Sequence, residues 1–360
     1  MIKFTRGVPP PESFPAGQLA ECAKSVLEKH SAVVLQYGPA GGFVPLRNWI
    51  AQSCQVTENR VILGQGSLQL MDILSKLLLS QGDVAYTEEP TYDRTITVLR
   101  RTGAQVVGFP LTKDGPDIDQ MEARLKSGER PKLFYTIPDF QNPSGMVIPQ
   151  ESRKRMLALA DKYDFWILED SPYRPLRYFG SEIPSLFEQN PDRVVRLSSY
   201  SKLISPGLRV GYAVLPDTLA KQVLKYAEDT YINASYLNQA IVIDYIEKGW
   251  FKANLESLKH LYTPRLETIL ASLESNLGDF GSWHKPEGGF FVGLTTNFPL
   301  DAGELLKKAE ESNLQLTDGR GFFVNGDGSR FIRLPFCALT PEEIKTGIQR
   351  LAKVLDTFRK

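Results

Sequence analysis

Cysteine is scarce in this chain, which has three in 360 residues, Cys22, Cys54 and Cys337. Three cysteines so far apart exclude a disulfide framework and a cysteine-rich zinc site, and they suit a reducing compartment. Net charge is lacking as well, because 42 Lys and Arg residues balance 42 Asp and Glu residues. A neutral chain has no bulk attraction for nucleic acid or for an anionic membrane, so we expect neither as a partner.

Long apolar runs are also missing. None reaches the roughly 18–20 residues that a membrane-spanning helix needs, and the opening MIKFTRGVPPP lacks the apolar core of a signal peptide. Hydrophobic residues make up 42% of the chain and charged residues 23%, which is close to globular averages. These features predict a folded, cytoplasmic protein of one or two domains.

Short apolar runs alternate with stretches of helical period through the first part of the chain. The runs are DVAYTEEP, AQVVGFPL, KLFYTIPD, FWILEDSPY, VVRLSSYSK and RVGYAVLP, and the helical stretches include IDQMEARLKSG and PQESRKRMLALADKYD. This alternation predicts an α/β fold, with a mostly parallel sheet covered by helices on both faces. Ser67 is placed to cap one such helix, which should stop at Gly82.

The pattern changes from about residue 217 to long helices, followed by a pair of short strands, GGFFVGLTT and SRFIRLPF, and a last helix. We therefore expect a large α/β domain at 31–245 and a smaller α+β domain at 246–360. We expect no regular structure in the opening segment, residues 1–30, because its FTRGVPPPESFP is rich in proline, and we expect this segment to pack with the small domain.

Polar side chains follow several of the predicted strands where each strand ends. In an open parallel sheet, ligands bind beyond these carboxyl ends, next to helix N-termini that attract anions. Arg209 follows seven residues after Lys202 and could reach the same anion. The residues that this rule brings together are Asn142, Asp170, Tyr173, Ser199, Ser201 and Lys202, beside the helix start at Gly66 and Ser67.

Pyridoxal 5′-phosphate requires a particular set of groups in its binding site: an amine, a carboxylate, a phenol, an amide and an anion cradle. Its aldehyde needs a lysine for a Schiff base, and its phosphate needs N–H, hydroxyl and guanidinium donors. Its ring nitrogen needs a carboxylate to stay protonated, which makes the ring an electron sink.

Seven motifs of this chain, in order and spacing, resemble those of the class I/II pyridoxal-phosphate-dependent aminotransferases of fold type I. The similarity is to the branch that contains aminoadipate and kynurenine aminotransferases, and it runs from GVPPPESFP to RFIRLPF. It implies a large cofactor-binding domain with a mostly parallel, seven-stranded type of sheet, and a smaller α+β domain.

Two motifs carry the resemblance at the lysine and the phosphate. SYSKLISPGLRVGY resembles the cofactor-lysine motif and makes Lys202 the lysine of the internal aldimine. GQGSLQ resembles the start of the phosphate-binding helix. The phosphate site that these motifs imply consists of Gly66, Ser67, Leu68, Ser199, Ser201 and Arg209.

Three motifs carry the resemblance around the cofactor ring. PTY implies that Tyr92 stacks on the ring, and QNPSG supplies Asn142. EDSPY supplies Asp170 for the ring nitrogen and Tyr173 for the ring oxygen. The resemblance thus makes Lys202, Asp170 and Tyr173 the catalytic residues, and it implies no metal.

The remaining motifs concern the substrate and the partner subunit. RFIRLPF makes Arg333 the clamp for the substrate α-carboxylate, with Asn142 beside it. LQYGPAGGFVPLR resembles the segment whose tyrosine, here Tyr37, reaches the phosphate and substrate of a partner subunit. The resemblance therefore implies a homodimer with composite active sites.

The implied activity is transfer of an amino group from an L-amino acid to a 2-oxo acid, expected to be 2-oxoglutarate, by a ping-pong aldimine and ketimine mechanism. A β-lyase or another enzyme that acts at Cα or Cβ is an alternative, since the motifs fix the cofactor and not the bond that breaks. A second alternative is the truncated, aminotransferase-like sensor domain of a transcription regulator. The complete regulator would need a DNA-binding domain ahead of GVPPPESFP. No pattern selects the amino donor, although Arg6, Tyr37 and residues 231–236 are candidates for its pocket.

Overall fold

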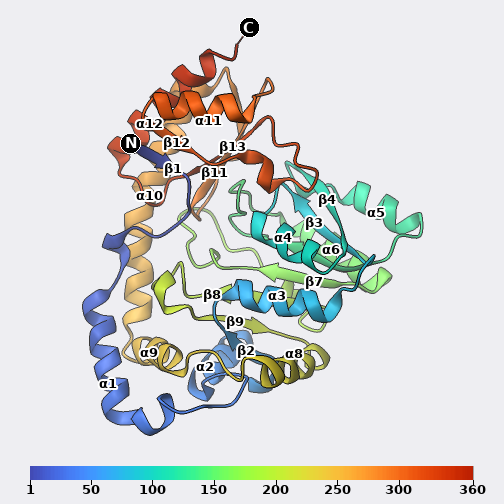
Figure 1. Ribbon diagram of the computed structural model, residues 1–360, viewed down its shortest axis with the longest axis vertical. Coiled ribbons are helices and arrows are strands. Elements are labelled where there is room, and N and C mark those ends of the chain that lie inside the picture. Colours follow the sequence, from blue (N-terminus) through green and yellow to red (C-terminus); the bar gives the residue numbers. More distant parts are fainter. Residues whose placement is uncertain (360) are drawn as a thin grey trace.

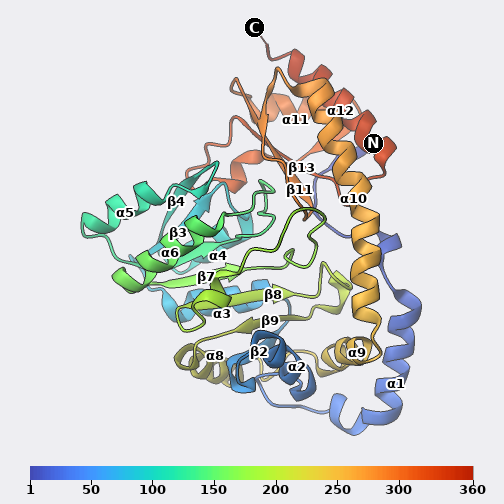
Figure 2. The same cartoon turned by 180° about the vertical axis from the view of Figure 1, so that it is seen from behind.

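The computed structural model of the chain describes residues 1–359 (Figure 1). Within these residues the strands form one eight-stranded sheet, one three-stranded sheet and one two-stranded sheet. Figures 1 and 2 show the large sheet below the C-terminal helices and strands.

The large sheet is mostly parallel, as the sequence predicts. Every strand except β9 and β5 points the same way. The two-residue β5 folds back on β4, so the sheet has eight strands where the resemblance implies a seven-stranded type. In spatial order the strands are β2 (Val61–Gly64), β9 (Gly211–Val214), β8 (Val194–Ser199), β7 (Trp166–Asp170), β6 (Pro131–Thr136), β3 (Val84–Glu89), β4 (Gln105–Thr112) and β5 (Gly115–Pro116).

Each face of this sheet has its own hydrophobic core, because successive strand residues point to opposite faces. Phe134 and Ile167 point into one core, and Leu133 and Leu168 into the other. The first face is covered by α2 (Val44–Cys54), α5 (Ile118–Lys126), α6 (Gln150–Tyr163), α7 (Leu186–Gln189) and α9 (Tyr236–Glu247). The second is covered by α3 (Ser67–Leu78), α4 (Asp93–Arg101) and α8 (Asp217–Thr230). Burial on both faces explains the continuous apolar runs of the central strands.

The C-terminal part of the chain builds a separate core around an antiparallel sheet of order β10-β11-β13. The strands are β10 (Gly281–Trp283), β11 (Phe291–Thr296) and β13 (Phe331–Pro335), and the helices are α10 (Trp250–Leu277), α11 (Ala302–Glu311) and α12 (Pro341–Asp356). The 28-residue α10 contacts both α9 and α12, so it joins the two parts of the molecule (Figure 2).

The proline-rich opening segment is more regular than expected. Its β1 (Ile2–Phe4) pairs in parallel with β12 (Leu314–Leu316), beside the C-terminal core (Figure 1). The short 3-10 helix η1 (Pro11–Ser13) follows, and then α1 (Ala16–Val34) packs against α9. The prediction of no regular structure in this segment was wrong, because β1 depends on a partner about 310 residues away and α1 begins just after the prolines and packs on α9. The boundaries 1–30, 31–245 and 246–360 stay predictions.

Three further 3-10 helices are η2 (Glu58–Arg60), η3 (Pro206–Leu208) and η4 (Gly319–Phe322). Among the helices of residues 1–359, none combines the length and apolar character needed to cross a membrane.

Candidate active site

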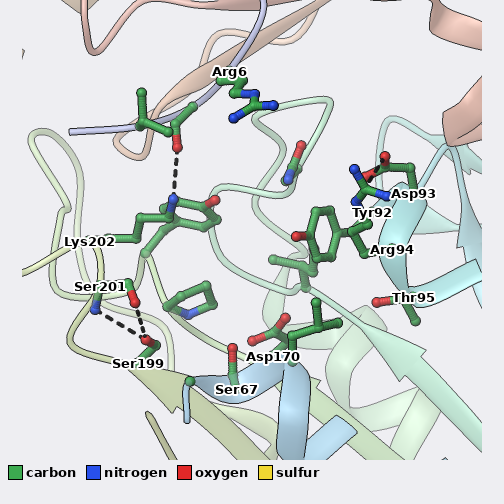
Figure 3. Close-up of a pocket in the computed structure, with 18 of the residues that line it drawn as sticks. Arg6, Ser67, Tyr92, Asp93, Arg94, Thr95, Asp170, Ser199, Ser201 and Lys202 are labelled. Carbon is green, nitrogen blue, oxygen red and sulfur yellow. Dashed lines mark hydrogen bonds and ion pairs between the residues drawn. The ribbon is translucent and has the colours of Figure 1, made fainter. Parts of the chain in front are cut away.

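The carboxyl ends of β7 and β8 open into a cavity of about 530 Å³ (Figure 3). The cavity also borders the start of α3 and the strands β11 and β13, so both parts of the molecule contribute to it. The predicted site residues that line it are Gly66, Ser67, Leu68, Tyr92, Asn142, Asp170, Tyr173, Ser199, Ser201, Lys202, Arg209 and Arg333.

Asp170 is the last residue of β7 and is buried. Its Oδ2 accepts a hydrogen bond from the phenol of Tyr135 at 2.7 Å, whereas its Oδ1 is buried with no partner among residues 1–359. Burial raises the pKa of Asp170 to about 6, while the Tyr135 hydrogen bond and the charge of Lys202 act in the opposite direction. A buried carboxylate with one free oxygen is suited to bind a cationic N–H group.

Lys202 lies in the turn after β8, and its Nζ donates to the backbone carbonyl of Gly7 at 2.8 Å. Burial lowers the pKa of Lys202, and the guanidinium groups of Arg333 and Arg209 act in the same direction. A lowered pKa leaves more of the amine neutral, and the neutral amine is the form that acts as nucleophile and base.

The start of α3 forms one wall of the cavity. Gly66 precedes the helix with a φ of 87°, and a Cβ at this position would come within 2.5 Å of Nη2 of Arg209. The sequence prediction that Ser67 caps this helix was wrong, because Gly66 holds the N-cap position and Ser67 is the first helical residue. The helix also ends at Leu78, before Gly82. The free N–H groups of a helix start attract an anion.

Hydroxyl and guanidinium donors lie beside this helix start. The Ser199 hydroxyl accepts from the backbone N–H of Ser201 at 3.1 Å and lies 2.9 Å from the Ser201 hydroxyl. Nη2 of Arg209 donates to the carbonyl of Gln65 at 2.7 Å, which fixes the guanidinium next to Gly66. Together these groups could hold a phosphate.

Arg333 projects from β13 into the cavity. Its Nη1 donates to Oδ1 of Asn142 at 3.1 Å and its Nη2 to the carbonyl of Thr5 at 2.7 Å, while its buried Nε has no partner among residues 1–359. The guanidinium also lies 4.5 Å from the ring centre of Phe322 and 5.1 Å from that of Phe291. Burial lowers the pKa of Arg333. A fixed guanidinium with a free N–H is suited to bind a carboxylate.

Two tyrosines supply aromatic walls and phenol groups. Tyr92 takes the N-cap position of α4, and Tyr173 packs edge-on against Phe290 and Phe291, with ring centres 5.5 and 5.7 Å away. Burial raises the pKa of both phenols. Each therefore remains a hydrogen-bond donor at neutral pH.

Tyr37 lies outside the cavity, and its side chain is 76% exposed. Its predicted place at a partner subunit's site stays a prediction. Among the candidates for a side-chain pocket, Arg6 lines the cavity, whereas residues 231–236 do not (Figure 3).

The sequence reasoning missed Tyr135, which binds Asp170, and the carbonyls of Thr5 and Gly7, which bind Arg333 and Lys202. One signal could have found Tyr135, because a phenol inside the buried run KLFYTIPD needs a hydrogen-bond partner. Backbone carbonyls leave no signal in the sequence.

The cavity thus combines a lysine of lowered pKa, an anion cradle, and a carboxylate and a guanidinium that each keep one polar atom without a partner in the described part of the chain, residues 1–359. These groups fit the aldehyde, the ring nitrogen and the phosphate of pyridoxal 5′-phosphate, and the carboxylate of an amino acid. Within residues 1–359, no group of three His, Cys, Asp or Glu side chains is arranged to hold a metal ion.

Known proteins similar to this chain agree with that chemistry. Residues 1–351 match the family described as aminotransferase class I and II. An aromatic-amino-acid aminotransferase of Thermococcus litoralis is 34% identical over 99% of this chain and 88% of its own length. The crystal structure of an α-aminoadipate aminotransferase of Thermus thermophilus, complexed with N-(5′-phosphopyridoxyl)-L-leucine, has a TM-score of 0.94 at 33% identity, over 99% of this chain and 92% of its own. A kynurenine aminotransferase of Pyrococcus horikoshii has a TM-score of 0.96 at 29% identity, over 100% of this chain and 92% of its own.

Proposed function

Because this chain belongs to the class I and II aminotransferases, which work with pyridoxal 5′-phosphate, we propose that Lys202, Asp170 and Tyr173 are its catalytic residues. One observation carries the proposal: Lys202, Asp170 and Arg333 line the same cavity, and within residues 1–359 neither Oδ1 of Asp170 nor Nε of Arg333 has a hydrogen-bond partner. Transamination needs a base, an anion for the ring nitrogen and a clamp for the substrate carboxylate, and these three groups supply them.

We propose that the anion cradle binds the cofactor phosphate and that Asp170 binds the ring nitrogen. When bound, pyridoxal 5′-phosphate supplies an electron sink that stabilises negative charge at the substrate Cα. Tyr92 stacks on the ring, and Asn142 and Tyr173 donate to its oxygen. The phosphate is held by Gly66, Ser67, Leu68, Ser199, Ser201 and Arg209.

Lys202 moves the proton in this proposal. With the cofactor bound, the amine of Lys202 would hold its aldehyde in the resting enzyme and, as the neutral free amine, would take the proton from the substrate Cα as general base. Burial among guanidinium groups lowers the pKa of Lys202, which favours the neutral amine that this step needs. The same amine returns a proton when the amino group is passed on.

Arg333 orients the substrate. Its guanidinium binds the α-carboxylate, and the Asn142 amide and the Thr5 carbonyl hold the guanidinium in place. We infer that 2-oxoglutarate is the amino acceptor. Arg6 supports this inference, because it lines the cavity together with its neighbours Thr5 and Gly7. Its guanidinium, in addition to that of Arg333, can bind the distal carboxylate of 2-oxoglutarate.

We propose a homodimer in which Tyr37 completes the site of the other subunit. Val33, Leu35, Tyr37 and Val44 are all exposed although they are hydrophobic and lie near one another in the sequence, and exposed apolar side chains of this kind favour an interface. We also propose that the protein works in the cytoplasm, because its cysteines are free thiols, as suits a reducing compartment.

The test is to incubate the cofactor-loaded protein with a panel of L-amino acids and 2-oxoglutarate, and to measure glutamate. We expect glutamate to form with at least one donor, and Lys202→Ala to abolish its formation. Lys221→Ala is the matched control, because Lys221 is exposed on α8, away from the cavity. Release of pyruvate and ammonia without glutamate would instead identify a β-lyase, and normal turnover by Lys202→Ala would refute the proposed site.

A further inference from the structure

The hydrogen bond between Tyr135 and Asp170 has no part in the roles described above. From its geometry we propose that Tyr135 is a positioning residue, which holds one oxygen of Asp170 so that the other faces the cofactor and the carboxylate stays charged. This inference rests on the proposed role of Asp170 at the ring nitrogen.

The sheet register places the two side chains together. Tyr135 on β6 pairs with Leu168 on β7, two residues before Asp170, so both side chains point to the same face of the sheet. The phenol reaches Oδ2 of Asp170 at 2.7 Å and leaves Oδ1 without a partner among residues 1–359. The terminal torsion of a carboxylate is otherwise broad, so this one bond decides which oxygen is free.

Packing makes Tyr135 a rigid anchor. Its side chain is fully buried in the core that α3, α4 and α8 form on this face of the sheet. Burial, together with the charge of Asp170, keeps the pKa of Tyr135 well above its ordinary value. The phenol therefore remains a donor at every pH at which the enzyme would work.

The donated hydrogen bond also acts on the charge of Asp170. Burial favours the neutral acid, and a hydrogen bond donated to the carboxylate favours the charged form. Lys202 also favours the charge, whereas Glu169 opposes it. The other ionisable groups that interact with Asp170 are Glu88, Tyr92 and Tyr173.

Tyr135→Phe removes the hydroxyl and keeps the ring. Because the pKa of Asp170 should then rise, we expect the acid limb of the kcat profile, and the pH midpoint of the bound cofactor's absorbance without substrate, to move to higher pH. We also expect kcat to fall about tenfold, as is typical for loss of a hydrogen bond to a charged group. Tyr86→Phe is the matched control, because Tyr86 is a fully buried strand tyrosine that donates to Glu129, away from the cavity. If Tyr135→Phe has the same absorbance midpoint and the same kcat as the control Tyr86→Phe, the proposal is overturned.

A double-mutant cycle separates this proposal from the role of Asp170 itself. In an Asp170→Asn background, Tyr135→Phe should change kcat less than about twofold, because its effect passes through the Asp170 charge. A full, independent loss in that background would overturn the positioning role. If Asp170→Asn is slow and Tyr135→Phe is normal, the positioning role alone fails, whereas a harmless Asp170→Asn removes the proposed function of Asp170 as well.

A second variant covers the case in which Tyr135→Phe does not fold. Incorporation of 3-fluorotyrosine at position 135 keeps the ring and hydroxyl and makes the phenol a stronger donor. The absorbance midpoint should then move to lower pH, opposite to the Tyr135→Phe shift. An unchanged midpoint would overturn the proposal.

Discussion

Arg333→Lys tests the substrate clamp by keeping the positive charge and removing the planar fork. In the structure Nη1 donates to Oδ1 of Asn142 and Nη2 to the carbonyl of Thr5, while Nε has no partner among the described residues 1–359. A lysine has a single nitrogen on a flexible stem, so it cannot hold these two groups and a carboxylate in one plane. We therefore expect the substrate to lose at least one charge-assisted hydrogen bond.

The size of the effect follows from that loss. One hydrogen bond to a charged group contributes about 1.5–3 kcal/mol, which corresponds to a decrease of about 10- to 150-fold in kcat/KM. Arg333→Ala removes the cation as well, and an uncompensated buried charge costs about 3–5 kcal/mol, so that loss should be larger. The α-carboxylate is common to all amino acids, so the factor should be similar for every donor.

The assay is kcat/KM for several donors and for the 2-oxo acid acceptor, in the wild type and both variants. Arg330→Lys is the control, because Arg330 precedes β13, is exposed, and donates only to the carbonyl of Asn297 among residues 1–359. Unchanged kcat/KM in Arg333→Lys, or a loss restricted to dicarboxylic substrates, would refute the assignment of Arg333 to the α-carboxylate.

Three other substitutions have distinct expected outcomes. Arg6→Ala should raise KM for 2-oxoglutarate about tenfold and leave KM for pyruvate unchanged; equal changes in steady-state KM would exclude Arg6 from the distal carboxylate. Burial raises the pKa of Asp170 from 3.8 to about 6, so the folded state binds this proton more tightly than the unfolded state does. The free energy of unfolding of the cofactor-free protein should therefore fall by up to about 3 kcal/mol as the pH rises from 3.8 to about 6. Asp170→Asn should remove that loss and raise the Tm of the cofactor-free protein at about pH 8, while turnover falls; an unchanged Tm would contradict the pKa. Tyr37→Phe, if it weakens cofactor retention by itself, should recover activity in a mixed dimer with Lys202→Ala, because both substitutions then affect one site and leave the other intact. No recovery would place Tyr37 outside the partner's site.

The sequence predicted the central strands well for a physical reason. Strands such as β6 and β7 are buried on both faces, so LFY and FWIL are continuous apolar runs that need no tertiary information to recognise. The polar residues just beyond such runs, Asp170 and Lys202 among them, then fall at one edge of the sheet by topology alone.

Features set by distant contacts could not be predicted. Gly66 takes the cap of α3 in place of Ser67, with a φ of 87° that side-chain-bearing residues rarely adopt, and it lies against the Arg209 guanidinium. β1 exists only through its pairing with β12. The exposed side chain of Tyr37 has no hydrogen-bond partner within residues 1–359, where only its backbone N–H donates, to Gln36, so its assignment depends on a second subunit.

The pairing of β1 with β12 has a consequence for synthesis on the ribosome. The carbonyl of Thr5 accepts its hydrogen bond from Arg333, which is 328 residues later in the chain, and Ile2 pairs with Leu314. Neither contact can form until these later residues have been translated. The large sheet can form while translation continues, since domains generally fold as units with the N-terminal part first. The strand β1 is translated long before β12, so it must remain without its partner until the C-terminal strands have emerged. Closure of the cavity by residues 5–7 is therefore one of the last events in the maturation of a newly made chain.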